Sequence, residues 1–120
     1  MRIDAKLIPL KQANVDVVKQ ALVDVVRQGT ARRAFAGAAY QAAGKTGTAQ
    51  VFSLRGAKNN ANAIDERLRD HALFMSYAPA ENPKIAVALI VENAGWGGSV
   101  AAPIVRKVFD YWLVERGQMQ

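Results

Sequence analysis

Residues 84–92 limit the possible folds more than any other segment, because their side chains alternate in a pattern typical of a β-strand. Both sets of alternating side chains are apolar, which is typical of a strand that is covered on both faces of its sheet. The face with the mostly small side chains has room for a helix. One face would carry Ile85, Val87, Leu89 and Val91, and the other Ala86, Ala88 and Ile90.

Two helices are expected, one towards each end of the chain. We expect Asn14 to cap the first helix and Gly29 to end it, with Arg27 in the last turn, where a cation suits the helix dipole. The second helix should start at Ser99 or Ala102. The expected apolar stripes are Val15, Val18, Leu22, Val25 and Val26 in the first helix, and Ile104, Val105, Val108, Phe109, Trp112 and Leu113 in the second.

Two more strands complete the expected sheet. Residues 40–43 should enter the first of them, which ends near Ser53 or Leu54, and the other should span residues 71–78. The polar segment 55–67 between them should be the most mobile part, with a short helical turn at 63–68. The sequence therefore predicts an α+β fold, in which an antiparallel sheet of about three strands packs with an N-terminal and a C-terminal helix.

Composition allows one domain and argues against several functions. The chain has 120 residues, and 51% of them are hydrophobic. It has no Cys, so disulfides and Cys-ligated metals are excluded, and we expect no metal or cofactor. The formal net charge is +6, but the basic residues lie in separate segments without interleaved aromatics, so we expect no nucleic-acid binding. No apolar run is long enough to span a membrane, so we expect no membrane contact from this segment.

Residues 45–49 carry the most informative chemistry of the chain. Lys45 supplies a cation, Thr46 and Thr48 supply hydroxyls, and Gly47 leaves a position without a side chain. A strand with these groups along one edge is suited to holding a carboxylate and a carbonyl beside a serine nucleophile. Three such residues also occur together by chance, and Gly47 would then mark only a bulge or a close backbone approach.

Other segments extend this motif into a family resemblance. Residues 44–113 together resemble the end of the transpeptidase domain of the penicillin-binding protein 2 family, the elongation type of class B penicillin-binding protein. The upstream segments 29–31 and 38–40 also fit. The resemblance rests on Lys45-Thr46-Gly47-Thr48-Ala49-Gln50-Val51-Phe52, on Glu66-Arg67-Leu68-Arg69-Asp70-His71, on Pro83 with residues 85–93, and on the turn Gly95-Trp96-Gly97-Gly98.

This resemblance implies a peptidoglycan D,D-transpeptidase, which is acylated at a serine by a stem peptide or by a β-lactam. It implies that Lys45 helps to bind the carboxylate of the substrate or penicillin, and that the hydroxyls of Thr46 and Thr48 contact the same carboxylate. Gly47 would let the acyl group lie against the strand. The backbone N–H of Thr48 would form half of an oxyanion hole. The catalytic residues expected here are thus Lys45 and Thr48, and the substrate-binding residues Thr46, Gly47 and Thr48.

The chain departs from the family pattern at the nucleophile. Ser53, Ser76 and Ser99 are its only serines, and none begins a Ser-x-x-Lys or Ser-x-Asn element. We therefore expect residues 1–120 to be the C-terminal part of a transpeptidase domain, inactive alone. Its partners would be the stem peptide, β-lactams and the remainder of the domain, possibly as a second chain. The resemblance places the parent enzyme at the periplasmic side of the bacterial inner membrane.

Two alternatives remain at the level of sequence. The chain could be a catalytically inactive segment that acts only as a binding or complementing partner, or the equivalent segment of the division-specific paralogue. Two single residues also have competing interpretations. His71 is expected to make a structural hydrogen bond beside Asp70 rather than to act in catalysis. Trp96 could bind a ligand, but the favoured interpretation is that it covers the start of the last helix.

Overall fold

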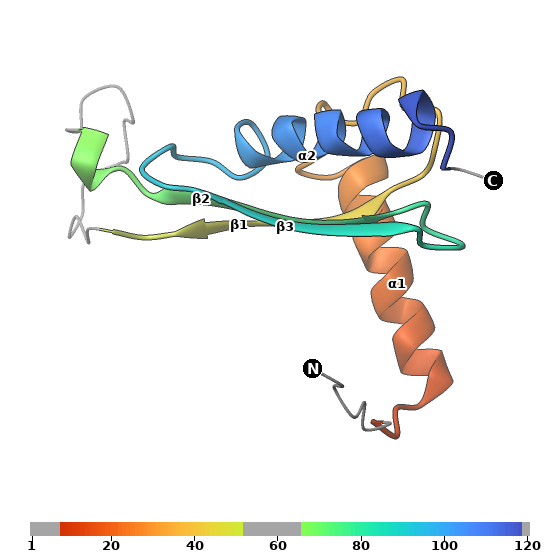
Figure 1. Ribbon diagram of the computed structural model, residues 1–120. Helices are drawn as coiled ribbons and strands as arrows, with labels where there is room; N and C mark the ends of the chain where they lie inside the picture. The colour runs from red at the N-terminus through yellow and green to blue at the C-terminus, as the bar shows by residue number, and fades with distance from the viewer. Residues whose placement is uncertain (1–7, 52–65, 119–120) are drawn as a thin grey trace, which may run out of the picture.

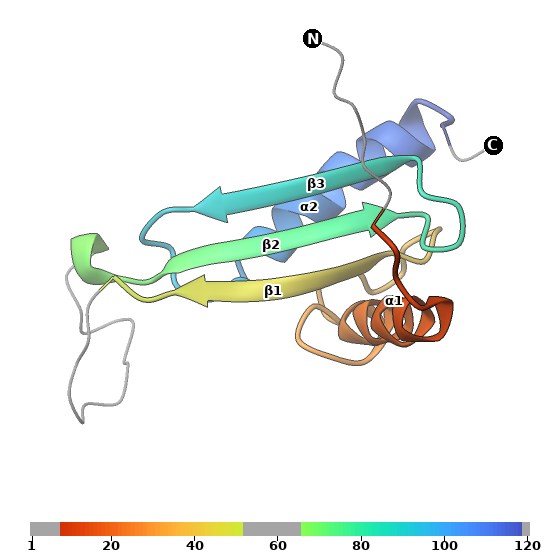
Figure 2. The ribbon, with the colours of Figure 1, turned by 90° about the horizontal axis from the view of Figure 1, so that it is seen from below.

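The computed structural model describes residues 8–51 and 66–118. They form a three-stranded antiparallel sheet in the order β1-β2-β3, with strands β1 (Ala43–Ala49), β2 (His71–Ala78) and β3 (Ile85–Val91). Helix α2 (Ala101–Phe109) lies across one face, and α1 (Gln12–Arg27) projects beyond the other face (Figure 1). Helix α1 lies at the edge of the sheet beside β1 (Figure 2). This confirms the α+β class predicted from the sequence. Figure 2 shows the sheet from the side that α2 leaves open.

The sheet register determines which side chains meet α2. Phe74 lies opposite Leu89 of β3 and Thr46 of β1, so these three side chains share the α2 face. Neighbouring Met75 lies opposite Ala88 and therefore points to the open face. A single core results between the sheet and α2. Its largest fully buried side chains are Phe74, Phe109, Leu113 and Val105.

The loop after α1 completes this core. It forms consecutive turns over residues 30–37. The ring of Phe35 packs 5.9 Å from that of Phe74 and 6.2 Å from that of Phe109, measured between ring centroids. Because aromatic pairs add to the stability gained by burial, this loop is fixed against both the sheet and α2.

Several element boundaries agree with the sequence prediction and others do not. Strand β2 has the predicted bounds, whereas β1 ends at Ala49 instead of near Ser53 or Leu54. The reason is that Ala49 pairs with His71, the first residue of β2, so no partner continues the ladder. A 3₁₀ turn, Glu66–Leu68, confirms the end of the helical turn expected at 63–68. The rest of segment 55–67, with its predicted mobility, lies outside the described residues.

Helix α1 begins earlier than predicted. Its cap is Lys11 rather than Asn14, and no side chain caps the first turn. Instead, the Gln12 side chain donates a hydrogen bond to the Asp16 carboxylate over 2.8 Å, one turn further along the helix. Gly29 follows the helix as expected. A glycine is needed there, because a Cβ would lie 2.9 Å from Val25 Cα.

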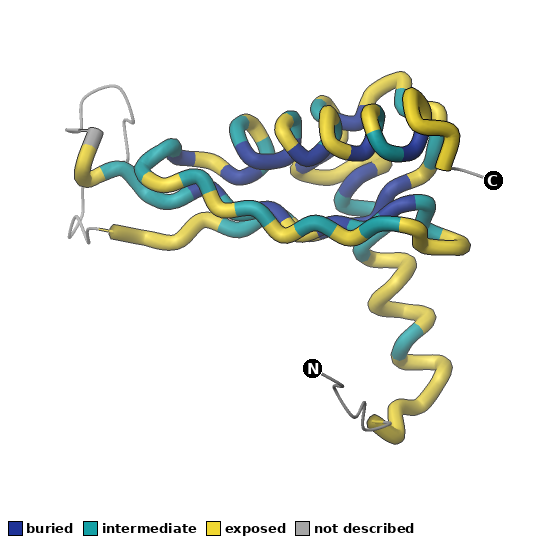
Figure 3. Tube along the Cα trace, viewed as in Figure 1, coloured by how far each residue is buried: buried dark blue, intermediate teal, exposed yellow. Residues whose placement is uncertain are grey.

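The expectation that both faces of β3 are covered is wrong for the described residues. Only the face carrying Ile85, Val87, Leu89 and Val91 packs against the core. Ile90 is 53% exposed on the other face, and Met75 beside it is 54% exposed. Much of α1 is also exposed to solvent: Val17 is 70% exposed and Val18 57% (Figure 3). No described helix is long and apolar enough to cross a membrane.

Hydrogen bonds made by an ion pair within the last helix, Arg106 with Asp110, fix that helix to the loop after α1. A π-helical stretch, Asp110–Glu115, extends α2, and the Asp110 carboxylate accepts hydrogen bonds from Arg106 Nε at 2.7 and 2.8 Å. The Tyr40 hydroxyl donates to the same carboxylate over 2.8 Å. Arg106 also donates to the carbonyl of Ala36 over 3.1 Å. Burial, together with the Asp110 contact, raises the pKa of the Tyr40 hydroxyl.

We expect Asp110→Asn to lower the free energy of unfolding by about 1–3 kcal/mol, because it leaves a mostly buried guanidinium without its counter-charge. The matched control is Asp24→Asn, which breaks an exposed i,i+3 pair with Arg27 and should cost less than about 0.5 kcal/mol. Urea unfolding of both variants at one chain concentration measures the difference. Equal losses would show that the Asp110 contacts contribute no more than a surface pair.

A glycine turn after β3 brings the chain close to two strands. Gly97 packs so tightly that a Cβ there would lie 2.2 Å from the Leu73 carbonyl oxygen and 2.6 Å from that of Gly47. A Cβ on Gly98 would lie 2.5 Å from the carbonyl oxygen of Thr30. Since all three neighbours are backbone atoms, they cannot move aside as a flexible side chain could. The turn therefore holds β1, β2 and the loop after α1 together.

Gly97→Ala should destabilise the fold by about 3 kcal/mol, because the added methyl overlaps the backbone of two strands. Gly95→Ala is the matched control in the same turn. Gly95 has φ +91° but open space around its missing Cβ, so only the backbone conformation should cost free energy, about 1–2 kcal/mol. Thermal unfolding ranks the two variants. A smaller loss of stability for Gly97→Ala than for Gly95→Ala would mean that the turn can move away from the sheet.

Candidate functional site

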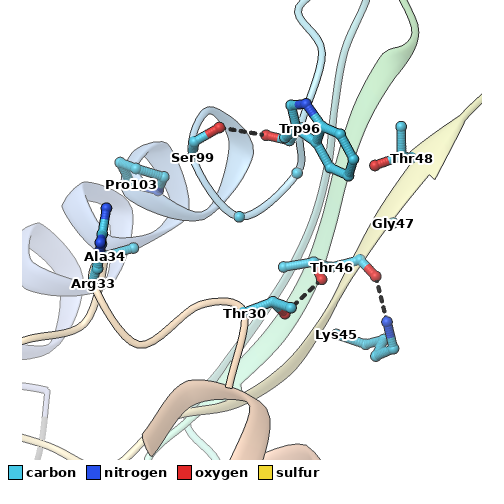
Figure 4. Close-up of a pocket in the computed structure, with 12 residues that line it drawn as sticks. Thr30, Arg33, Ala34, Lys45, Thr46, Gly47, Thr48, Trp96, Ser99 and Pro103 are labelled. Atoms are coloured by element: carbon cyan, nitrogen blue, oxygen red, sulfur yellow. Dashed lines mark hydrogen bonds between the residues drawn. The ribbon is translucent and has the colours of Figure 1, made fainter. Parts of the chain in front are cut away.

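A groove of about 1050 Å³ lies where the glycine turn, β1 and the loop after α1 meet (Figure 4). These segments are far apart in the sequence, and the close backbone contacts of Gly97 and Gly98 bring them together. The first four residues of the motif predicted from sequence all lie in its wall. The groove is lined by Thr30, Arg33, Ala34, Lys45, Thr46, Gly47, Thr48, Trp96, Gly97, Gly98, Ser99 and Pro103.

Strand β1 presents its motif residues to two sides. Register places Thr46 and Thr48 on the α2 side, and Lys45 and Gly47 on the open side. The Lys45 side chain is exposed, and its ammonium donates to the carbonyl oxygen of Thr46 over 2.7 Å. Because β1 is an outer strand of the described sheet, one of its edges is free of strand partners. An anionic ligand could therefore reach the Lys45 ammonium and backbone N–H groups of the strand from this edge.

Gly47 lies between two close neighbours. On the open side, an added Cβ would lie 3.3 Å from Leu73 Cβ. On the other side, the backbone of Gly47 is in contact with Gly97. The close backbone approach that sequence analysis gave as one explanation of this glycine is therefore present. A hollow of about 440 Å³, lined partly by Lys45, Gly47 and Met75, adjoins it on the open face.

Two polar residues that the loop after α1 brings to the groove were not predicted from the sequence. The Thr30 hydroxyl lies 2.8 Å from the Thr46 hydroxyl, across the gap between the loop and β1 (Figure 4). Arg33 adds a second cation to the lining. Their loop was noted in the sequence only as a short segment that fits the family. No periodicity or spacing could indicate that it packs against the motif strand.

Trp96 is held by its backbone, while its side chain is free. Its carbonyl oxygen accepts hydrogen bonds from the N–H groups of Ser99 and Val100 at 3.2 and 3.0 Å. The indole is 63% exposed and lines the groove. The favoured interpretation from sequence, that Trp96 covers the start of the last helix, is therefore wrong, and the position agrees with the alternative of a ligand-facing aromatic.

His71 makes the structural hydrogen bond that was predicted. Its Nδ1 accepts the backbone N–H of Asn93 over 2.9 Å. Asn93 has φ +51°, and its side-chain amide donates to the carbonyl oxygens of Arg67 and Arg69 at 3.0 Å each. This histidine thus joins the end of β3 to the start of β2 and is not among the residues that line the groove.

The groove is lined by groups suited to binding an anion, but its lining shows no serine with an acid–base partner. Ser99 is the one serine in its lining, and its hydroxyl donates to the Trp96 carbonyl over 3.2 Å. The lining contains no His, Asp or Glu that could act as its base. Among the residues that the structure describes, no three His, Cys, Asp or Glu side chains gather as metal ligands would. The described residues of the groove therefore offer cations and hydroxyls to an anionic ligand.

Comparison with known proteins identifies the family. The family model of the penicillin binding protein transpeptidase domain matches residues 4–110. A peptidoglycan D,D-transpeptidase, MrdA, from Haemophilus influenzae is 56% identical over 89 residues, which cover 73% of this chain and 14% of that protein. The chain thus spans about one seventh of the length of this relative.

Solved structures agree in fold. The structure of Pseudomonas aeruginosa PBP2 in complex with WCK 5153 matches with a TM-score of 0.74 and 44% identity, over 92% of this chain and 22% of that one. The penicillin G acyl-enzyme complex of penicillin-binding protein A from Mycobacterium tuberculosis matches with a TM-score of 0.58 and 30% identity, over 87% of this chain and 21% of that one. The chain belongs to the transpeptidase domain family of penicillin-binding proteins, as its sequence motifs implied.

Proposed function

We propose that this chain is a segment of a peptidoglycan D,D-transpeptidase of the penicillin-binding protein 2 type, and that it supplies one wall of the active site. The observation that carries the proposal is the groove in which residues 45–48 of an outer strand meet the glycine turn. The relatives support the reaction, since one is named as a D,D-transpeptidase and another is solved as a penicillin G acyl-enzyme. The names MrdA and PBP2 favour the elongation type over the division-specific paralogue.

Each motif residue has a role that its position allows. Lys45 would bind the carboxylate of the stem peptide or of the β-lactam, because its ammonium is exposed at the groove. The hydroxyls of Thr46 and Thr48 would donate to the same carboxylate. Gly47 would let the acyl group lie against β1, beside the hollow on the open face. The N–H of Thr48 would donate to the developing oxyanion, an interaction worth about 10²–10³ in rate in other acyl-transfer enzymes.

The remainder of the domain would supply the nucleophile and cover the open face of the sheet. Large apolar side chains on that face, such as Met75 and Ile90, are about half exposed, and so is the apolar stripe of α1 at Val18. Patches of this kind are typical of surfaces that bind another part of a protein. We place the reaction on cell-wall peptidoglycan, the substrate that the relative's name gives, and at the periplasmic side of the inner membrane.

The chain alone should not be acylated by a fluorescent penicillin, because none of Ser53, Ser76 and Ser99 begins the Ser-x-x-Lys element that activates the nucleophile. Intact-mass analysis after incubation tests this, with the complete transpeptidase domain as the positive control. A stoichiometric adduct on the chain would contradict the assignment of the nucleophile to another segment. Failure of the complete domain to form an adduct would instead favour the alternative of a catalytically inactive, complementing segment.

In the complete domain, Lys45→Ala should slow acylation by about 100-fold or more without changing the melting temperature, because it removes an exposed, groove-facing charge. Thr48→Val should act in the same direction but less strongly, since the backbone N–H remains. Lys107→Ala is a matched control, because Lys107 is exposed on α2 and does not line the groove. Acylation within a few-fold of the unmodified rate for Lys45→Ala would remove Lys45 from the site.

A further inference from the structure

We propose that Thr30 is a positioning residue that sets the hydroxyl of Thr46 for an anionic ligand, an inference that rests on the proposed function. The oxygens of the two hydroxyls are 2.8 Å apart, a normal distance for an O–H···O hydrogen bond. Thr46 lies in the motif strand, whereas Thr30 lies in the loop after α1. Figure 4 shows the two side chains pointing towards each other at the groove.

The backbone holds Thr30 in place from both sides. The N–H of the following residue, Ala31, donates to the Val25 carbonyl over 3.1 Å, and Ala31 is fully buried. Gly98 packs against the carbonyl oxygen of Thr30, and a Cβ on Gly98 would also lie 3.6 Å from Thr46 Cγ2. The glycine turn therefore touches both threonines at once. The relative position of the two hydroxyls is fixed by the fold rather than by long flexible side chains.

The direction of this hydrogen bond decides what Thr46 can offer a ligand. A threonine hydroxyl has one proton to donate and two lone pairs to accept with. If Thr46 donates to Thr30, it can present only lone pairs, which repel an anion. If Thr30 donates to Thr46, the Thr46 proton is free to point into the groove. A carboxylate beside the Lys45 ammonium would favour this second arrangement, and the two hydrogen bonds in series would polarise each other.

The proposed effect of Thr30 depends on the negative charge of the ligand, whereas a purely structural effect of Thr30 would not. Loss of the Thr30 hydroxyl should weaken the interaction of Thr46 with a carboxylate, but should matter little for a ligand whose carboxylate is masked. It should also matter little once the Thr46 hydroxyl is gone. A residue that only stabilises the loop would affect both ligands and both backgrounds alike.

The test measures the second-order rate constant of acylation of the complete transpeptidase domain by penicillin G and by its methyl ester. Thr30→Val, which keeps the shape of the side chain, should lower the rate constant for penicillin G about 5- to 10-fold, and that for the ester less than 2-fold. Thr30→Ser keeps the hydroxyl and should stay within 2-fold for both ligands. In a Thr46→Val background, adding Thr30→Val should change the penicillin G rate less than 2-fold.

Four results would overturn the inference. An unchanged rate for Thr30→Val with penicillin G would show that Thr30 does not set Thr46, and the proposed function would stand. Equal losses of acylation rate for penicillin G and its ester would show a structural role only. Equal losses with and without the Thr46 hydroxyl would show the same. In either case, circular dichroism melting of the variants would show a matching loss of stability. Absence of acylation in the unmodified domain would overturn the proposed function and this inference together.

Discussion

The close backbone contact between the glycine turn and the strands is the constraint on which the rest of the structure depends. Gly97 lies directly on the backbone of Gly47 and Leu73, and Gly98 lies on that of Thr30. No side chain larger than hydrogen fits at either position. This contact brings the indole of Trp96 to β1 and sets the depth of the groove. It also sets the start of α2, because the Ala102 N–H donates to the Gly97 carbonyl over 2.9 Å.

The two faces of the sheet have different roles in this account. The face under α2 forms a core closed by Phe35, Phe74 and Phe109. The other face carries apolar residues that the described chain leaves half exposed, among them Met75 and Ile90. At about 25 cal/mol per Å², a few hundred Å² of uncovered apolar surface corresponds to several kcal/mol, comparable with the whole stability of a small domain. A larger assembly that covers this face is therefore favoured.

Local sequence patterns predicted the elements better than the contacts between them. The bounds of β2 were predicted correctly, and helical periodicity identified Val105, Phe109 and Leu113, which the structure buries against the sheet. Ile104 and Val108, expected in the same apolar stripe, are 42% and 40% exposed. The end of β1 could not be predicted, since it depends on where the partner strand begins. The pairing of Thr30 with Thr46 was equally inaccessible, because it arises from the packing of a loop. The family motif indicated one wall of the groove, whereas the second wall came only from the fold.

The measurement that tests the central claim most directly is sedimentation of the purified chain over a range of concentrations, combined with binding of a hydrophobic dye. If the open face of the sheet belongs to the inside of a larger domain, the chain should self-associate or bind the dye, because the surface around Met75 and Ile90 is left uncovered. A monomer that unfolds cooperatively and binds no dye would contradict the claim that another part of a transpeptidase completes this structure.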